Sequence, residues 1–253
     1  ILRTMLAPSL LNNLALNYNR KVEEVKVFEL GTVYKPLKDA QLPEERLKLA
    51  AAVMGLDFPA NWEVGAPGFF YLKGILEDYF EYLGIESVQF SPTDAAYLHP
   101  GRAAQVELAG DKIGYLGEVH PEVSEEYGLE ERATICELEF EPILEAATFE
   151  RQYEAIPRYP ALQRDIALVV EEDITHQEIE GVIKEVGGEI LESVELFDVY
   201  QGEQIPDGYR SLAYSLNYRI QERTLTDEEV NKVQEKIEKE LNSRLDIELR
   251  KRD

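Results

Sequence analysis

The stretch S-L-A-Y-S-L-N-Y-R-I at residues 211–220 alternates apolar and polar side chains without a break. A period of two is typical of a β-strand that buries one of its faces. Residues 164–170 show the same alternation, residues 190–200 are strand-like, and Ile247 and Leu249 indicate a short last strand. The C-terminal third of the chain is therefore predicted to contain four strands of one antiparallel sheet.

Two segments of the same region switch to the helical period, one at residues 175–186 and one that follows Thr226. Each begins with a capping box, formed by Thr175 with Glu178 and by Thr226 with Glu229. The order is strand, helix, strand, strand, helix, strand. This order predicts a ferredoxin-like βαββαβ sandwich, in which both helices pack on one face of the sheet.

The second face of this sheet has no helix to cover it. Its side chains are mostly small, with one aromatic ring and a few charged groups, so a flat ring has room to lie on the sheet. A splayed nucleic-acid base stacks on such an aromatic, and polar neighbours can read its edges. An ordinary solvated face is the alternative interpretation, since antiparallel sheets commonly have one. The expected face carries Asp165, Ala167, Asp198, Tyr200, Ser211, Ala213, Ser215, Asn217, Arg219 and Arg250.

Several short runs in this region resemble the ferredoxin-fold anticodon-binding domain at the C-terminal end of the beta subunit of bacterial phenylalanine–tRNA ligase. The runs are PRYP at 157–160, RDIA at 164–167, FDVY at 197–200, SLAY at 211–214, RTLTDEEV at 223–230 and ELR at 248–250. The family usually has a Gly-Ala step before the last run, where this chain has Leu-Asp-Ile.

The resemblance implies that the sheet face receives the tRNA anticodon. The resulting hypothesis is that the first anticodon base stacks on Tyr200, while Asp198 and Ser211 contact its edges. Ala167 would leave clearance for the base, and Arg250 would pair with phosphate or stack.

The charge of the chain limits this hypothesis. The formal net charge is -24, with 13 basic and 27 acidic residues before Pro157 and 13 basic and 23 acidic residues from there on. Affinity for phosphates comes mostly from Lys and Arg, so neither part attracts RNA through its overall field. What the composition allows is local recognition of a few exposed bases, with phosphate contacts made by other parts of a complex.

The preceding part of the chain is predicted to be a separate mixed α/β domain. The boundary is placed near residue 150, within a polar stretch at 141–160 that holds three prolines, so the domains are 1–150 and 157–253. The expected helices begin near Pro8 and cover 68–83. The expected strands are 25–34, 47–54, 88–90, 102–108, 112–117 and 134–140, with an exposed loop at 35–46.

This first domain is similar to the matching region of the same beta subunit, through LRT at 2–4, FELG at 28–31, HPGR at 99–102 and GYLGEVHP at 114–121. In that family the region copies the antiparallel-sheet fold of class II synthetases without its chemistry. A working site of that class holds the ATP α-phosphate with an arginine, whereas Phe28 stands at the corresponding place here. No Gly-rich stretch with a following Arg is found either. The domain is therefore expected to be a scaffold with no catalytic residues.

The resemblance further implies a catalytic alpha subunit as partner, with two of each chain in the enzyme, and phenylalanine tRNA as ligand. ATP and magnesium would be used by the complex, with no cofactor in this chain. The chain opens on Ile1 and has one cysteine, Cys136, and no apolar stretch of membrane-spanning length. We therefore expect a cytoplasmic, excised portion of a longer protein.

Three other interpretations are open on the sequence. His99, His120 and Glu118 could bind a metal, although both histidines precede proline and no further well-spaced ligand is evident, so no metal site is predicted. Ferredoxin-like modules also bind free amino acids in regulatory proteins, which makes an amino-acid sensor the main alternative function. A purely structural subunit is the third interpretation.

Overall fold

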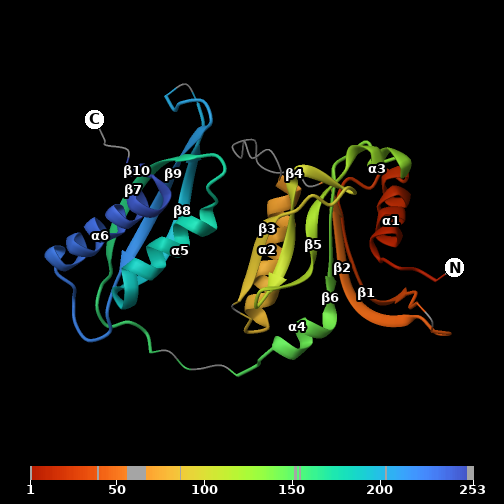
Figure 1. Ribbon diagram of the computed structural model, residues 1–253, viewed down its shortest axis with the longest axis horizontal. Helices are drawn as coiled ribbons and strands as arrows, with labels where there is room; N and C mark the ends of the chain where they lie inside the picture. The colour runs from red at the N-terminus through yellow and green to blue at the C-terminus, as the bar shows by residue number, and fades with distance from the viewer. Residues whose placement is uncertain are drawn as a thin grey trace. The chain divides into compact units, whose positions relative to one another are not determined.

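The computed structural model describes residues 2–38, 40–55, 67–85, 87–150, 153, 155–202 and 204–249. The chain divides into two compact units, Ile1–Gln152 and Tyr153–Asp253 (Figure 1). Within the described ranges, none of the helices combines the length and apolar character required to cross a membrane.

Unit 1 is built on a six-stranded antiparallel sheet in the order β1-β2-β6-β5-β4-β3. Its strands are β1 (Val25–Lys35), β2 (Glu44–Met54), β3 (Val88–Pro92), β4 (Leu98–Leu108), β5 (Asp111–Val119) and β6 (Ala133–Glu139). All six predicted strands are present, although most of them extend by a few residues beyond the predicted bounds. The antiparallel sheet expected for this domain is thus confirmed.

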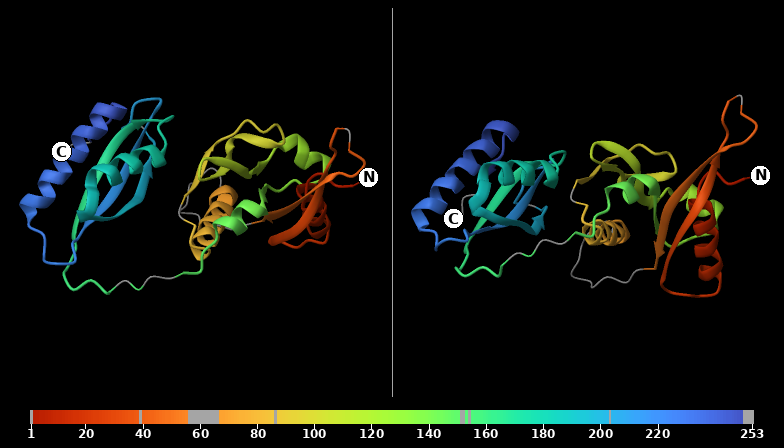
Figure 2. Two further views of the ribbon diagram at one scale, coloured as in Figure 1. Left: turned by 60° about the horizontal axis from the view of Figure 1, so that its bottom comes forward. Right: turned by 90° about the horizontal axis from the view of Figure 1, so that it is seen from below.

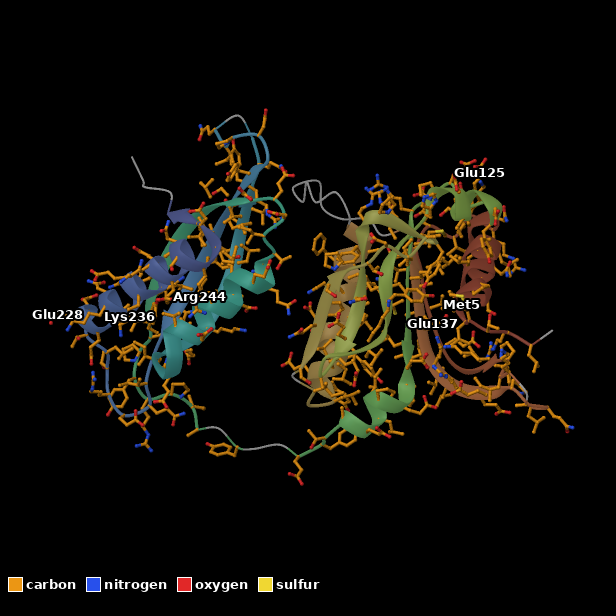
Figure 3. The ribbon with its side chains drawn as sticks, viewed as in Figure 1. Met5, Glu125, Glu137, Glu228, Lys236 and Arg244 are labelled. Carbon is orange, nitrogen blue, oxygen red and sulfur yellow. The ribbon has the colours of Figure 1, made fainter. Side chains whose placement is uncertain are left out.

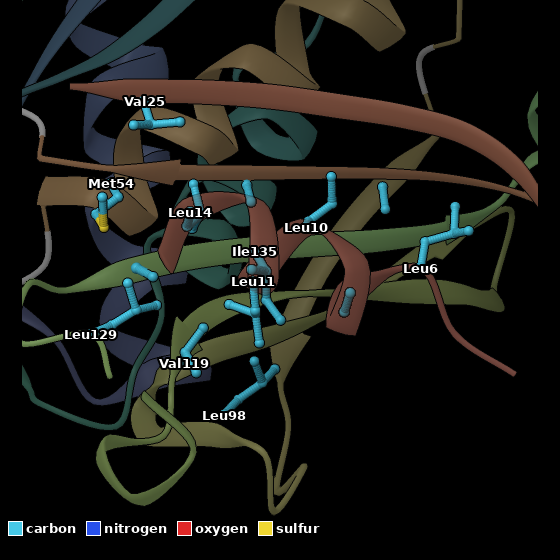
Figure 4. Close-up of a cluster of buried hydrophobic side chains, with 14 of the residues drawn as sticks. Leu6, Leu10, Leu11, Leu14, Val25, Met54, Leu98, Val119, Leu129 and Ile135 are labelled. Carbon is cyan, nitrogen blue, oxygen red and sulfur yellow. The ribbon is translucent and has the colours of Figure 1, made fainter. Parts of the chain in front are cut away.

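Helices cover both faces of the unit 1 sheet, as two views of the ribbon show (Figure 2). Helix α1 (Ala7–Asn19) packs through Leu10, Leu11 and Leu14 on a cluster that includes Ala52 of β2 (Figure 4). Helix α2 (Pro67–Tyr82) packs on a different cluster that includes the neighbouring Val53. Successive residues of a strand point to opposite faces, so the two helices lie on opposite sides of β2.

The start of α1 is held by a carboxylate of the central strand β6. Glu137 is 1% exposed, and its Oε2 accepts hydrogen bonds from the backbone N–H groups of Leu6 at 2.8 Å and Ala7 at 3.0 Å (Figure 3). Its Oε1 lies 2.9 Å from Nζ of Lys48 in β2. The first N–H groups of a helix lack partners within the helix and carry partial positive charge, so a buried carboxylate satisfies them.

Two short helices of unit 1 were not predicted from the sequence. Helix α3 (Pro121–Glu126) lies in the acidic run, with the side chain of His120 as its N-cap. Helix α4 (Phe140–Ala146) follows β6 directly, in the segment expected to belong to the domain boundary. Both are at most two turns long, and helices of that length depend on tertiary contacts more than on sequence period.

Unit 2 has the predicted ferredoxin-like arrangement. Its strands β7 (Leu162–Glu171), β8 (Leu191–Tyr200), β9 (Tyr209–Tyr218) and β10 (Glu248–Leu249) form an antiparallel sheet in the order β10-β7-β9-β8. Helices α5 (His176–Gly187) and α6 (Asp227–Leu245) both pack on one face of this sheet, over a core that includes Leu168, Tyr214 and Ile237 (Figure 1). A one-turn 3₁₀ segment, η1 (Gly188–Ile190), joins α5 to β8. The opposite sheet face carries no helix among the described residues.

Both predicted capping boxes are confirmed, at Thr175 with Glu178 and at Thr226 with Glu229. In the second box, Glu229 also pairs with Arg223 at 2.5 Å. The Arg223 guanidinium and the N–H and hydroxyl of Thr226 lower the pKa of the Glu229 carboxyl to about 2. The start of α6 is therefore tied to the preceding loop.

We expect Glu137→Ala to lower the free energy of unfolding of unit 1 by about 2–5 kcal/mol, because it leaves two buried helix N–H groups without an acceptor. It also removes the nearer carboxylate of Lys48, whose ammonium keeps Glu139 at 3.4 Å. Urea denaturation followed by circular dichroism would measure the loss. Glu125→Ala, which changes an exposed residue of α3, is the control and should stay within about 0.5 kcal/mol of the parent chain. A loss below about 1 kcal/mol for Glu137→Ala would contradict the role given to this carboxylate.

Glu229→Gln should destabilise unit 2 at neutral pH and have no effect in strong acid. The folded pKa lies below the ordinary carboxyl value of 4.5, so the charge stabilises the fold above pH 4.5 and the contribution is lost as the pH falls to about 2. Glutamine keeps the capping geometry and removes only the charge. Urea midpoints at pH 7 and between pH 4.5 and 2 would test this, with Glu228→Gln as the control. A difference that does not shrink with acid would refute the charge explanation.

Candidate nucleic-acid interface

A change of register in β8 decides which of its side chains reach the open face. Leu196 pairs with Tyr214 of β9 and packs against the core, whereas Asp198 pairs with Ala213, with the register shift between them. Residues 196, 198 and 200 would share one face in a regular strand, because side chains alternate. The extra residue, Phe197, is a β-bulge that turns Asp198 and the residue two positions later away from the core.

Two adjacent rows of paired residues then cross the open face. The first row joins Ala167 of β7, Ala213 of β9 and Asp198 of β8, and the second joins Val169, Ser211 and Tyr200 in the same order. Paired residues of neighbouring strands lie about 5 Å apart. The structure therefore brings together four of the predicted site residues, namely Ala167, Asp198, Tyr200 and Ser211. The fifth, Arg250, lies outside the described residues.

The exposure of these side chains gives the face a stepped shape. Tyr200 is 38% exposed and stands at the end of β8, whereas its neighbour Ser211 is 6% exposed and lies in the floor. Ala167 and Ala213 are half-buried and present only methyl groups. The result is an accessible Tyr200 ring beside a low floor of small side chains, with Tyr209 half-buried in the next row of the same face. Such a surface suits a flat ligand that stacks on the Tyr200 ring.

Hydrogen bonds within the face distinguish its two ends. Toward the far end, Gln163 Nε2 donates to Ser215 Oγ at 2.6 Å and Asn217 Nδ2 donates to Ser193 Oγ at 3.0 Å. Near Tyr200, within the described part of the chain, no side-chain hydrogen bond or ion pair engages Asp198 or the Ser211 hydroxyl. The polar groups beside the ring are thus the ones available to a ligand.

The described part of the face is acidic. Asp165, Glu195 and Asp198 are exposed on β7 and β8. Arg219, directly after β9, is paired with Glu192 through Nε at 3.2 Å. A carboxylate accepts hydrogen bonds and repels phosphate, so this surface can bind N–H donors on a base edge but gives little attraction for an RNA backbone.

Two further residues that were considered from the sequence, Phe28 and Cys136, lie in unit 1. Phe28 is 77% exposed on β1, and the following Glu29 is paired with Arg3 at 2.5 Å. Burial raises the pKa of the Cys136 thiol to about 12, as expected for a small buried side chain.

The possible metal ligands of unit 1 do not meet. His99 Nδ1 lies 2.6 Å from the Pro100 carbonyl oxygen, His120 Nδ1 accepts from the N–H of Glu122 at 3.3 Å, and Glu118 is paired with Arg102 at 2.8 Å. Across the described ranges, His, Cys, Asp and Glu form no group of three that could hold a metal ion.

Two residues of importance at this site were not identified from the sequence. One is Phe197, whose position as a bulge had a signal: an apolar Leu196 cannot share a regular strand face with Asp198 and Tyr200 if that face is open. The other is Gly202, which lies against the Tyr200 ring. No sequence pattern pointed to it, because the contact depends on the path of the loop after β8.

Comparison with known proteins identifies both units. The model of the phenylalanyl tRNA synthetase beta chain CLM domain matches residues 1–140, and that of the ferredoxin-fold anticodon binding domain matches residues 157–250. A solved structure of a pyrrolysyl tRNA synthetase, PylSc from Desulfitobacterium hafniense, overlaps 56% of this chain and 48% of its own, with 19% identity and a TM-score of 0.44.

Curated relatives match along nearly the whole chain. Phenylalanine–tRNA ligase beta subunits are 43% identical over 98% of this chain in Symbiobacterium thermophilum and 44% identical over 99% in Moorella thermoacetica. The same subunit of Clostridium acetobutylicum is 40% identical over 99%. The chain spans only 28% of the length of the first relative and 31% of the other two. With both domain models matched in order, the chain belongs to the phenylalanyl tRNA synthetase beta chain family.

Proposed function

We propose that this chain is a non-catalytic part of a phenylalanine–tRNA ligase beta subunit and supports the ATP-dependent attachment of phenylalanine to its tRNA. Unit 2 recognises the tRNA anticodon, and unit 1 docks the catalytic alpha subunit. The observation that carries the proposal is the half-exposed Tyr200 ring beside a floor of small residues, on the sheet face that α5 and α6 do not cover. The family membership gives that face its ligand.

In this proposal the first anticodon base stacks on Tyr200. Ser211 and Asp198 contact its edges, Asp198 by accepting hydrogen bonds from N–H donors of the base. Ala167, two strands away in the neighbouring row, provides the clearance that a larger side chain would fill. Arg250, which is not among the residues that the structure describes, pairs with a phosphate or stacks on the base.

The acidic surface fits recognition of a few bases and not of the RNA backbone. Affinity for the whole tRNA then comes from other parts of the assembled enzyme, and unit 2 contributes selectivity for the anticodon. This division of roles reconciles the formal net charge of -24 with a nucleic-acid ligand.

Unit 1 acts in this proposal as a scaffold in a cytoplasmic enzyme made of two alpha and two beta chains. ATP and magnesium are used by the whole complex, and adenylate formation is assigned to the alpha subunit because Phe28 stands where this chain would need a cation for it. Phe28 and Leu30 are exposed apolar side chains of β1, of the kind that subunit contacts bury. The alternative of an amino-acid sensor is not favoured, since the matched family of unit 2 is an anticodon-binding one.

Tyr200→Ala in the full-length beta chain, assembled with its partner, should weaken tRNA binding by about 1–3 kcal/mol, the usual value of one base stack. The measurement is the KM for tRNA in aminoacylation, with phenylalanine-dependent ATP–pyrophosphate exchange as a tRNA-independent readout that should not change. Tyr153→Ala, at a tyrosine that is 88% exposed outside the sheet face, is the matched control. An unchanged KM for Tyr200→Ala would contradict the proposal that this face binds the anticodon.

A further inference from the structure

The ring of Tyr200 rests against a glycine. A Cβ atom added to Gly202 would lie 2.6 Å from the Tyr200 hydroxyl oxygen and 2.8 Å from Cζ, both far inside van der Waals contact. Gly202 does not have a positive φ, so its backbone would accept an alanine. What requires a glycine here is therefore space for the tyrosine.

Two hydrogen bonds lie next to the Tyr200–Gly202 contact. The Gly202 carbonyl oxygen accepts a hydrogen bond from the N–H of Ile205 at 2.8 Å, and the Ile205 side chain is buried. On the other side, Gln201 donates through Nε2 to the Glu172 carboxylate in the turn after β7. The atoms that an added Cβ would meet first belong to the distal end of the Tyr200 side chain, which moves more easily than backbone, so this end of the ring is the part that gives way to an added group.

The other end of the tyrosine is set by the bulge at Phe197 and by the pairing of Tyr200 with Ser211 across the sheet. The Cα–Cβ bond of Tyr200 therefore has a fixed direction, and the tilt of the ring depends on what meets its hydroxyl end. Stacking energy depends on the offset and the angle between the two ring planes, so a tilted ring would bind a base less well.

We propose that Gly202 is a positioning residue for base recognition, which sets the tilt of the Tyr200 ring by leaving space for its hydroxyl end. The inference rests on the proposed function of the sheet face and adds a specific residue to it.

The test is Gly202→Ala in the full-length beta chain, assembled with its partner. We expect the KM for tRNA to rise roughly 3- to 30-fold, less than the roughly 5- to 150-fold that losing a whole base stack corresponds to. ATP–pyrophosphate exchange and the urea midpoint should stay unchanged. Gly181→Ala is the matched control: it adds the same methyl group in α5 with nothing within 4 Å, and should leave the KM unchanged.

A double substitution separates positioning from a general structural effect. If Gly202 acts through the ring, Gly202→Ala should add nothing to Tyr200→Ala, because there is no longer a ring to displace. When a tRNA with 2-aminopurine at the first anticodon position binds, the fluorescence of that base should be quenched less by the Gly202→Ala enzyme than by the parent enzyme.

The inference is overturned if Tyr200→Ala raises the KM while Gly202→Ala does not, or if Gly202→Ala has its full effect in the Tyr200→Ala background. A Tyr200→Ala variant with a normal KM would instead refute the proposed function itself. The two failures are therefore distinguishable.

Discussion

The ferredoxin-like unit has a sheet with two faces and helices for only one of them, and the rest of its properties follow from this constraint. The covered face takes the large apolar side chains, including Leu168 and Tyr214, and forms the core. The uncovered face has small side chains at its centre, mainly alanine and serine, and the accessible Tyr200 near the end of β8, which is where we propose that a ligand binds. A bulge at Phe197 is needed because Leu196 lies in the core and Asp198 on the open face, whereas two residues at this spacing share one face in a regular strand.

In the proposed function, the charge and the shape of the open face have separate roles. The described part of the face carries exposed carboxylates, and its nearby Arg219 is engaged by Glu192. Such a surface gains nothing from counterion release, which supplies most of the affinity of proteins that bind nucleic acid alone. Its contribution in the proposed function is selective contact with a base that other parts of the enzyme bring to it.

In unit 1, one buried carboxylate connects several elements of the fold. Glu137 of the central strand binds the first N–H groups of α1 and the ammonium of Lys48, so it connects three elements that are far apart in the sequence. A buried carboxylate is stable there because each of its oxygens has a donor. The negative charge of the buried Glu137 side chain thus offsets the partial positive charge at the start of α1.

The sequence by itself determined the strands and the longer helices of both domains, the capping boxes of α5 and α6 and the fold class of unit 2, because hydrophobic period and cap residues act within a few positions of the chain. Only the tertiary structure decided the short helices α3 and α4, the Glu137 anchor, the bulge at Phe197 and the contact of Gly202 with Tyr200. These features depend on cross-strand register and on the path of loops, which are set by residues distant in the sequence. The period of two identified the side chains of the open face, and the pairing of three strands brought four of them together.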